Sequence, residues 1–463
     1  MSFPRYERYK DSGMEWVGNL PSSWSINKIK FNTYVKGRVG WHGLNSNEFS
    51  DVGIHLITGT DFENGFVSWD KCYRISEQRY IEDPYIQLRE NDLLITKDGT
   101  IGKLARVKGL PEQASLNSGI FLVRANDGTY LEDFLYWVLQ SSLFAHFMDL
   151  HKVGSTIQHL YQEVFNQFAF PIPSIPEQKT IAAFLDRETA KIDALIAEQQ
   201  RLIELLKEKR QSVISHAVTK GLNPNAPMKD SGIECLGKVP EHWEVCALRR
   251  LLSVPLANGI FKKKDDFGDG VLLVNVFDVY QNDFKIKFEQ LDRVKCSPDE
   301  AITYQVLPED LFFVRSSLKQ EGIAAVVVAG ISAEEVVFEC HLIRARPKQS
   351  TVNSRYCSYL LNSPIYRAKM IAKAKITTMT TIDQETILST ILPQPPKEEQ
   401  QTIAAFLDRE TAKLDTFTAE AKTAITLLQE RRTALISAAV TGKIDVRGLV
   451  SAKTEVQAET VPC

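Results

Sequence analysis

Two stretches of the chain place apolar or small residues about every 3.5 positions among Glu, Lys, Arg and Gln. The first opens with the capping-box sequence Ser-Ile-Pro-Glu at Ser174–Glu177 and has no further glycine or proline before Gly221. This pattern predicts a long helix with a narrow apolar seam that a second helix must cover. The expected seam residues are Leu185, Ile192, Leu195, Leu202, Leu206, Val213 and Ala217, and then Leu407, Leu414, Phe417, Ala424, Leu428, Leu435 and Ala439.

The second stretch is a copy of the first. Thr180–Lys191 returns letter for letter as Thr402–Lys413, an offset of 402 − 180 = 222 positions. Between Glu177–Thr219 and Glu399–Thr441, roughly 27 of about 43 positions are identical, which similar helix composition alone does not produce. The chain is therefore a tandem duplication.

A helix of about 43 residues is about 65 Å long, and the natural partner of each helix is the other copy. We expect an intramolecular coiled coil, whose direction stays open because a whole domain joins the two helices. Periodicity alone also fits a plain spacer, but a spacer needs only its seam, and the identical block extends beyond it. We therefore expect the outward residues to dock the same partner twice: Asp186, Arg187, Glu188 and Lys191, with Asp408, Arg409, Glu410 and Lys413.

The segments before the helices predict two α/β domains with one fold and different surfaces. Each has short β-rich runs bounded by Gly, Asn and Asp, followed by a helix, at 132–151 and at about 355–373. Residues about 32–152 and 250–374 share only scattered positions. The expected fold class is two α/β (α+β) domains separated by two long helices that form an intramolecular coiled coil, as a pseudo-two-fold tandem repeat.

Proline-rich segments at 170–173, 221–227 and 392–396 mark the expected boundaries. The polar tail has no pattern and is expected to be disordered. The predicted organisation is a first variable domain at 1–172, a central helix at 173–221, a second variable domain at 222–392, a C-terminal helix at 393–446 and a tail at 447–463.

Composition narrows the class of protein. No run of about 18 apolar residues and no apolar leader is present, so we expect a cytoplasmic protein without membrane contact. Seven scattered cysteines and eight histidines lack metal-ligand spacing, so neither a disulfide framework nor a metal site is expected. The net charge of −3 argues against non-specific binding of nucleic acid, unless basic residues gather on one face or a partner supplies the phosphate contacts.

Two repeated motifs carry a resemblance. Pro-x-x-x-Glu-Gln-x-x-Ile-Ala-x-x-Leu-Asp opens both helices, at Pro173–Asp186 and Pro395–Asp408. Lys-Asp-Ser-Gly-x-Glu at Lys10, ending in Pro-x-x-Trp24, has its second copy at 229–243. Essentially the whole chain resembles the specificity subunits of type I restriction-modification systems.

The resemblance implies two target recognition domains, each reading one half of a split, asymmetric site in double-stranded DNA, held apart by the helices. It implies two methyltransferase subunits that use S-adenosylmethionine and restriction subunits that use ATP with Mg, with no cofactor on this chain. The sequence itself also lacks catalytic motifs. The nearest string to an adenine methyltransferase motif, Asn362-Ser-Pro-Ile-Tyr366, has Ser363 where the motif has proline and Ile365 where it has an aromatic residue, and no phosphate-binding loop is present. We expect a non-catalytic subunit.

Two other classes remain open. A coiled-coil adapter that bridges two proteins without reading DNA suits the near-neutral charge. A reader fused to its own methylase or nuclease is disfavoured by the missing motifs.

Candidate DNA contacts are cations in loops or at strand ends. Lys97 and Arg315 end two equivalent Asp-Leu strands, where a cation can donate to guanine or neutralise phosphate, although a solvated cation is as simple an interpretation. Polar residues also precede each helix. The cations are Arg38, Lys97, Lys262, Lys263, Lys264, Arg315, Lys369, Lys373 and Lys375, and the polar residues are Ser155, Thr156 and Gln158, aligned with Thr377, Thr378 and Thr380.

Overall fold

The computed structural model of the protein describes residues 3–38, 44–151, 159–233, 236–318, 322–376 and 379–449. The chain divides into two compact units, one made of residues 1–199 and 424–463 and the other of residues 200–423. Each unit therefore holds one α/β domain and one half of each long helix. The first unit is discontinuous in sequence, because the end of the chain returns to the domain with which the chain began.

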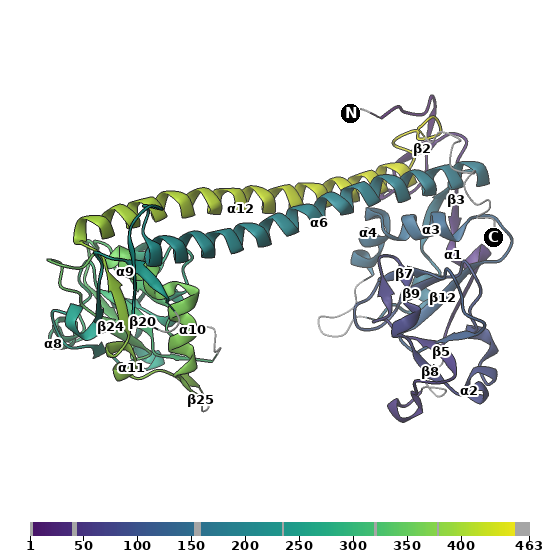
Figure 1. The fold of residues 1–463 in the computed structure, drawn as a ribbon. Helices are drawn as coiled ribbons and strands as arrows, with labels where there is room; N and C mark the ends of the chain where they lie inside the picture. The colour runs from purple at the N-terminus through teal and green to yellow at the C-terminus, as the bar shows by residue number, and fades with distance from the viewer. Residues whose placement is uncertain are drawn as a thin grey trace, which may run out of the picture. The chain divides into compact units, whose positions relative to one another are not determined.

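The long helices are α6 (Ile175–Lys220) and α12 (Lys397–Val440) (Figure 1). In the first unit the start of α6 lies against the end of α12, since Ile181 and Leu185 share one core with Ile436 and Ala439. The second unit joins the end of α6 to the start of α12 in the same way. The two helices therefore pair in the antiparallel direction, which the sequence left open.

Two equivalent ion pairs set the register of this helix pair. In the first unit Arg432 Nε lies 2.9 Å from Asp193 Oδ1, and in the second unit Arg210 Nη1 lies 2.8 Å from Asp415 Oδ1. The paired residue numbers give the same sum, 432 + 193 = 210 + 415 = 625, so both halves have one antiparallel register. Arg432 is the repeat equivalent of Arg210, and Asp415 is the repeat equivalent of Asp193, at the offset of 222 positions.

The seam itself corrects part of the sequence prediction. Leu195, Leu202 and Phe417 were expected on it but are 46%, 40% and 52% exposed. Polar residues take part in the buried or half-buried seam instead, which hides its phase from a search for apolar positions alone. In α6 the seam is Leu185, Thr189, Ile192, Ile196, Gln199, Ile203, Leu206, Arg210, Val213 and Ala217, and in α12 it is Leu407, Thr411, Leu414, Thr418, Ala421, Ile425, Leu428, Arg432, Leu435 and Ala439.

The domain of the first unit is built on a six-stranded sheet. Helices α3 (Glu132–Leu139) and α4 (Ser142–Leu150) lie between this sheet and the long helices (Figure 1). A three-stranded sheet packs against it through a shared core that includes Ile57, Leu94, Leu116 and Leu122, and its other face carries a separate small core. In spatial order the first sheet is β4 (Thr33–Gly37), β12 (Ile120–Ala125), β9 (Leu93–Thr96), β10 (Leu104–Arg106), β7 (Phe66–Val67) and β6 (Phe62–Glu63), and the second is β11 (Ala114–Leu116), β5 (Ile54–Ile57) and β8 (Tyr73–Ile75).

The domain of the second unit repeats this plan. Helix α9 (Ser354–Asn362) packs against the long helices, and α10 (Pro364–Ala372) follows it. One sheet runs β17 (Ala257–Asn258), β24 (Leu342–Ala345), β20 (Leu311–Val314) and β22 (Val326–Val328), another runs β19 (Asp292–Val294), β18 (Phe267–Val274) and β23 (Val336–Phe338), and a small one runs β21 (Ser316–Ser317), β26 (Thr380–Thr381) and β25 (Lys375–Ile376). The strand orders β4-β12-β9-β10 and β17-β24-β20-β22 are equivalent, as the sequence outline predicted.

Shorter elements complete both units. In each unit one hairpin and one short two-stranded sheet link the domain to the helices, and single-turn helices connect the strands. They are β1 (Tyr9–Asp11) with β2 (Asn19–Pro21), β3 (Ser25–Lys28) with β13 (Ala169–Ile172), β14 (Met228–Asp230) with β15 (Lys238–Pro240), β16 (Glu244–Ala247) with β27 (Ile391–Gln394), and helices α1 (Ile29–Asn32), α2 (Glu77–Ile81), α5 (Gln162–Phe165), α7 (Val276–Val279), α8 (Pro298–Thr303) and α11 (Gln384–Leu388). No helix in the described part of the chain is long and apolar enough to cross a membrane.

The repeated Pro-x-x-Trp element closes the end of a long helix in each unit. Gly442, with φ +69°, follows α12, and a Cβ there would lie 2.4 Å from Pro21 and 3.3 Å from Trp24. Gly221, with φ +73°, ends α6, and a Cβ there would lie 3.2 Å from the ring of Trp243. Glycine is needed at both positions for its left-handed backbone, and at Gly442 for its size as well.

We predict that Gly442→Ala destabilises the first unit more than Gly128→Ala does. Both glycines have left-handed φ angles, +69° and +71°, so each substitution carries a backbone cost of about 1–2 kcal/mol. A Cβ at Gly128 meets nothing within 4 Å, whereas one at Gly442 overlaps Pro21, which adds about 1–3 kcal/mol. Urea unfolding measures the difference, and equal losses in the two variants would contradict the packing described here.

Candidate nucleic-acid interface and docking surfaces

A buried glutamine near the start of α6 fixes the first domain to its helix. The side chain of Gln178 is fully buried, and its Oε1 accepts the backbone N–H of Leu131 at 2.8 Å. Its Nε2 donates to the carbonyl oxygens of Pro173 at 2.9 Å and Thr129 at 3.2 Å. Because Leu131 is the N-cap of α3, this one side chain sets where the domain's helix begins on the scaffold.

The same device recurs in the second unit. Gln400, also fully buried, accepts the backbone N–H of Asn353 at 2.8 Å and donates to Pro395 at 2.8 Å and Thr351 at 3.0 Å. Asn353 is the N-cap of α9, the counterpart of α3. The Glu-Gln pair of the repeated helix motif therefore has a structural explanation within the chain itself.

The aspartate eight residues further along each helix ties down an arginine from the domain. In the first unit Arg106 of β10 lies 3.1 Å from Asp186 and 3.4 Å from Asp133. Its guanidinium stacks 4.3 Å from the ring centre of Tyr136 and is almost fully buried. Because the arginine is buried, removing its carboxylate partner would leave an uncompensated buried charge, which is costly.

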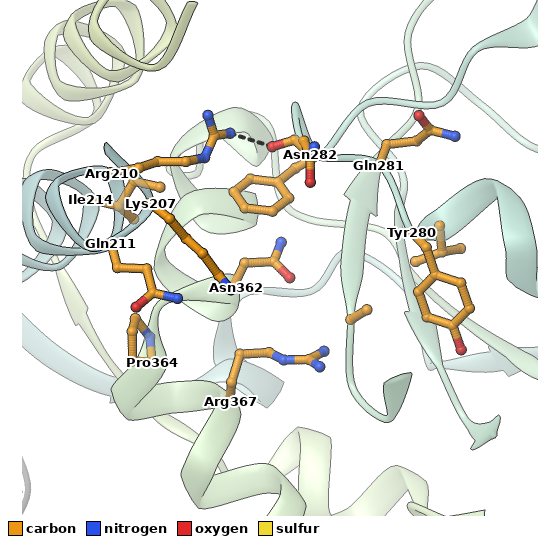
Figure 2. A pocket seen from close by; sticks show the side chains of 13 residues that line it. Lys207, Arg210, Gln211, Ile214, Tyr280, Gln281, Asn282, Asn362, Pro364 and Arg367 are labelled. Carbon is orange, nitrogen blue, oxygen red and sulfur yellow. Dashed lines mark hydrogen bonds between the residues drawn. The ribbon is translucent and has the colours of Figure 1, made fainter. Parts of the chain in front are cut away.

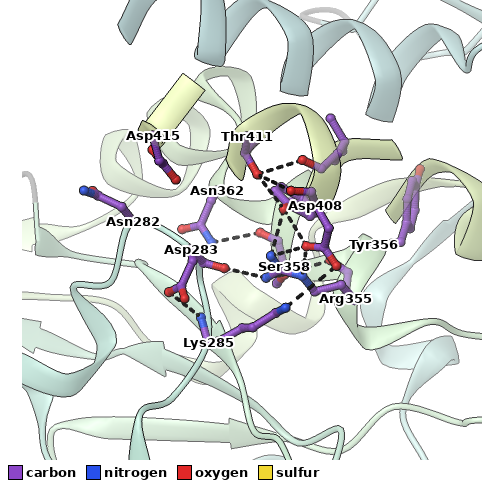
Figure 3. A network of polar contacts seen from close by, with 12 residues as sticks. Asn282, Asp283, Lys285, Arg355, Tyr356, Ser358, Asn362, Asp408, Thr411 and Asp415 are labelled. Carbon is purple, nitrogen blue, oxygen red and sulfur yellow. Dashed lines mark hydrogen bonds and ion pairs between the residues drawn. The ribbon is translucent and has the colours of Figure 1, made fainter. Parts of the chain in front are cut away.

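In the second unit the arginine comes from a different element (Figure 3). Arg355 of α9 donates through Nε to Asp408 Oδ1 at 2.7 Å, and the hydroxyl of Tyr359 donates to the same oxygen at 2.8 Å. Burial alone would raise the pKa of Asp408, but the hydrogen bond and the charge of Arg355 outweigh it, and the pKa is lowered. The carboxylate is thus held ionised as an anchor for the second domain.

The glutamate of the motif binds the strap of each unit, which is the segment that carries the repeated Pro-x-x-Trp element, at residues 3–24 in the first unit and 222–243 in the second. Glu177 accepts the hydroxyl hydrogen bond of Tyr6 at 2.7 Å. Glu399 accepts the indole N–H of Trp243 at 3.1 Å and lies 2.7 Å from the ring Nε2 of His242. Equivalent acids therefore hold the repeated strap elements by different donors.

The remaining residues of the expected partner-docking set face outward. On α6, Glu188 accepts from Arg187 Nε and from Lys191 Nζ, both at 2.9 Å, and the hydrogen bond from Lys191 is the first cause of its lowered pKa. Arg187 and Lys191 are exposed. Nothing in the domain of the first unit is bonded to this triad among the contacts of the described residues.

The second copy presents the same outward triad. Glu410 accepts from Lys413 at 2.9 Å and from Arg409 at 3.4 Å, and its pKa is lowered for the same reason. The expected set thus separates into two aspartates that anchor the chain's own domains and six residues, three on each helix, that stay available on the surface.

Among the expected DNA contacts, Arg38 and Lys262 are already engaged. Arg38 is only 2% exposed, its Nε donates to Leu116 O at 2.9 Å, and burial lowers its pKa. It therefore stabilises the first domain's interior and does not fit a contact with phosphate or a base. The side chain of Lys262 is largely buried and donates to Glu300 at 2.8 Å, which neutralises its charge locally.

Lys97 and Arg315 do lie at equivalent points of the two domains. Each follows the third strand in the matching orders, β9 or β20, and each donates its backbone N–H across that sheet at 2.8 Å, to Gly119 O and to His341 O respectively. Lys97 Nζ lies 4.0 Å from Asp98, and Arg315 Nη1 donates to Cys340 O at 3.4 Å. The prediction that they end equivalent strands is confirmed, while their contact with DNA stays a prediction.

The other expected contacts are surface cations or lie outside the described residues. Lys263, Lys264, Lys373 and Lys375 are exposed and Lys369 is half-buried. Lys375 Nζ is 3.6 Å from Asp383 yet its side chain remains 77% exposed. The polar residues Ser155, Thr156, Gln158, Thr377 and Thr378 are outside the part of the chain that the structure describes.

Sequence reasoning missed one group of cations in the second unit. Lys207 and Arg210 of α6 and Arg367 of α10 line a cavity of about 350 Å³ (Figure 2). Arg210 donates to the carbonyl of Asn282 as well as to Asp415, and burial lowers the pKa of Arg367. These residues belong to separate elements, so no spacing in the sequence links them.

Comparison with known proteins identifies the family. Residues 43–205 and 307–427 match the type I restriction modification DNA specificity domain. The chain is 23% identical to the EcoBI specificity subunit of Escherichia coli over 86% of this chain and 82% of that one, and 23% identical to the MjaVIII specificity subunit of Methanocaldococcus jannaschii over 97% and 99%. The EcoKI specificity subunit of E. coli strain K12 is 22% identical, with 92% and 90% covered.

Solved structures share the fold. One chain, from work on complex assembly and conformational transition of the type I R-M system, has a TM-score of 0.68 at 14% identity, covering 91% of this chain and 98% of that one. The HsdS subunit of Thermoanaerobacter tengcongensis has a TM-score of 0.54 at 14% identity with the same coverage.

The chain belongs to the family of type I restriction modification DNA specificity domains. It is a DNA-recognition specificity subunit with two target recognition domains on a helical scaffold, as the repeated motifs predicted. An adapter that does not read DNA is thereby set aside.

We predict that Gln400→Ala destabilises the second unit by about 2–3 kcal/mol, because it leaves the backbone N–H of Asn353 buried without its acceptor. Gln178→Ala should cost the first unit a similar amount. Gln200→Ala, at an exposed position on α6, is the control and should change stability by less than about 0.5 kcal/mol. Chemical unfolding measures all three, and a harmless Gln400→Ala would show that the glutamine does not anchor the domain.

Proposed function

We propose that the two recognition domains read the two halves of a split, asymmetric DNA site. The observation that carries this proposal is that the domains share one strand order and one set of anchors, at Gln178 and Gln400 and at Asp186 and Asp408, but differ in surface residues. Two domains that are anchored in the same way but have different surfaces are suited to recognise two different DNA sequences. Exposed Lys263, Lys264 and Lys373 would add phosphate contacts that position the DNA.

We further propose that the chain is a non-catalytic subunit that recruits two methyltransferase copies and restriction subunits. S-adenosylmethionine, and ATP with Mg, would then be used by those partners and not by this chain. The near-neutral charge supports weak, poorly selective DNA binding alone and tight binding with the partners.

The outward face near the start of each helix supports two copies of one partner. Leu195 and Phe417 are 46% and 52% exposed, and each lies seven residues after the glutamate of its triad, Glu188 or Glu410. A spacing of seven places them on the same helix face as the triad. A large apolar residue beside a charged triad, repeated in both units, fits an interface used twice.

We predict that Leu195→Asp combined with Glu188→Lys removes one of two methyltransferase copies, and that Phe417→Asp combined with Glu410→Lys removes the other. Reversed charge and a buried carboxylate should weaken each site by at least about ten-fold. Native mass spectrometry of the assembled complex counts the copies, with Val52→Asp, at an 82% exposed site in the first domain, as control. A wild-type complex with one copy or none would contradict the two-site arrangement.

The register of the helix pair supports a role in measuring the distance between half-sites. Positions 201 and 424, and 202 and 423, also add up to 625, the sum given by both interhelical ion pairs. Insertions after Arg201 and after Thr423 therefore fall opposite each other. Seven residues keep the seam in phase and add about 10.5 Å, or about three base pairs of DNA.

We predict that a heptad inserted after both Arg201 and Thr423 lengthens the unspecified spacer of the site, or abolishes its use, and leaves both half-site sequences unchanged. Methylation mapping in cells reports spacer and half-sites together. Paired four-residue insertions serve as the phase control, because they rotate the following residues by about 40° and should impair assembly more than the heptad does. Undiminished use of the original spacer would show that the helices do not measure distance.

A further inference from the structure

Beyond Lys97 and Arg315, the two domains share the backbone framework around these strand ends. Strands β5 and β11 run parallel, as do β18 and β23, so each pair ends at one common edge. The residue after the second strand of each pair donates its N–H back to the end of the first, from Asn117 to Ile57 at 2.9 Å and from Glu339 to Val274 at 3.1 Å. The same edge is therefore built twice.

Further backbone contacts hold this edge in both domains. Lys97 O accepts the N–H of Leu160 at 2.9 Å, and Arg315 O accepts that of Ile382 at 2.9 Å. An aspartate three residues on also accepts the N–H of the residue after β5 or β18, in each case at 2.7 Å. We call these edges the first and second recognition edge. The first comprises Thr60, Lys97, Asp98, Asn117 and His159, and the second comprises Phe277, Arg315, Leu318, Glu339 and His341.

The side chains on the two edges differ in chemistry. The first edge is polar, with His159 Nδ1 lying 2.5 Å from Asp98 Oδ1 and with both side chains accessible. The second edge is apolar at its rim, where Phe277 and Leu318 are 82% and 83% exposed. Both of these residues line a cavity of about 430 Å³, together with Tyr280, His341 and Glu339.

A cation is the constant feature of the two edges. Lys97 and Arg315 occupy the same place in the framework, and Lys375 of β25 adds a largely exposed ammonium beside β21 and β26 in the second domain. Constant cations suit the phosphate backbone, which is the same in every sequence, whereas variable side chains between them suit base edges. Each edge also holds one carboxylate, Asp98 or Glu339, so it is the shared position of the cation and the variation around it that favour DNA as the occupant of both edges.

We propose that the recognition edges are the base-reading surfaces, and that Phe277 and Leu318 of the second edge read the C5-methyl group of a thymine. This inference rests on the proposed division of the site between the two domains. Thymine alone among the four bases offers a methyl group in the major groove, and apolar side chains are what contacts it. The polar first edge reads its half-site by hydrogen bonds from Asn117 and His159.

The test uses the complex with its methyltransferase partner and a duplex carrying its mapped site. Each thymine of each half-site is replaced in turn by deoxyuridine, which removes only the methyl group. At least one replacement, confined to one half-site, should weaken binding about four-fold, the effect of exposing one methyl-sized group. In Phe277→Ala and Leu318→Ala the same replacement should have no effect. Ile302→Ala, at a position on α8 that is 74% exposed, should keep the four-fold difference.

Each outcome bears on one claim. The inference is overturned if no deoxyuridine duplex binds more weakly, if Phe277→Ala still distinguishes thymine from uracil, or if Phe277→Ala lowers the number of bound methyltransferase copies, which would make the edge a protein interface. A wild-type complex that selects no split site at all would instead overturn the proposed function. Asn117→Ala should relax a base in the other half-site only, and a change in the half-site of the second edge would contradict the assignment of edges.

Discussion

The antiparallel register of α6 and α12 is the constraint on which the other contacts of this protein depend. Because Asp193 meets Arg432 and Asp415 meets Arg210, each unit receives the start of one helix and the end of the other. The start supplies the glutamate, glutamine and aspartate that bind the strap and the domain, and the end supplies the surface that the Pro-x-x-Trp element closes. A slip of one heptad would separate these two sets of contacts in both units at once.

The two units keep the same anchoring acids on their long helices, but the residues that bind those acids come from different elements. Asp186 receives its arginine from a strand, Arg106, whereas Asp408 receives Arg355 from a helix. Glu177 binds a tyrosine and Glu399 a tryptophan. A scaffold that requires only a buried donor or cation at a given place admits domains with different sequences, which explains how two copies of one helix carry such dissimilar domain surfaces.

Much of this arrangement could be predicted from the sequence, because helix period, capping and duplication are local signals. The two helices, the α/β domains and the equivalence of Lys97 with Arg315 were all accessible in this way. The role of Asp186 was not, since its partner Arg106 lies 80 positions away in a segment that the duplication does not preserve. The seam was misplaced at Leu195 and Phe417 because Thr189, Gln199 and Arg210 take part in it. The burial of Arg38 depends on a strand pairing that no spacing shows.

Because the first unit is discontinuous in sequence, the two units can be completed only in a fixed order during translation. Residues 200–423 contain the whole second unit, so that unit can close as soon as its last helix turns leave the ribosome. The first domain is made earlier, yet Ile181, Phe184 and Leu185 keep an apolar face uncovered until Leu435, Ile436 and Val440 have been made. The domain translated first is thus the last to be completed, and its apolar face at residues 181–185 stays uncovered while residues 186–434 are made.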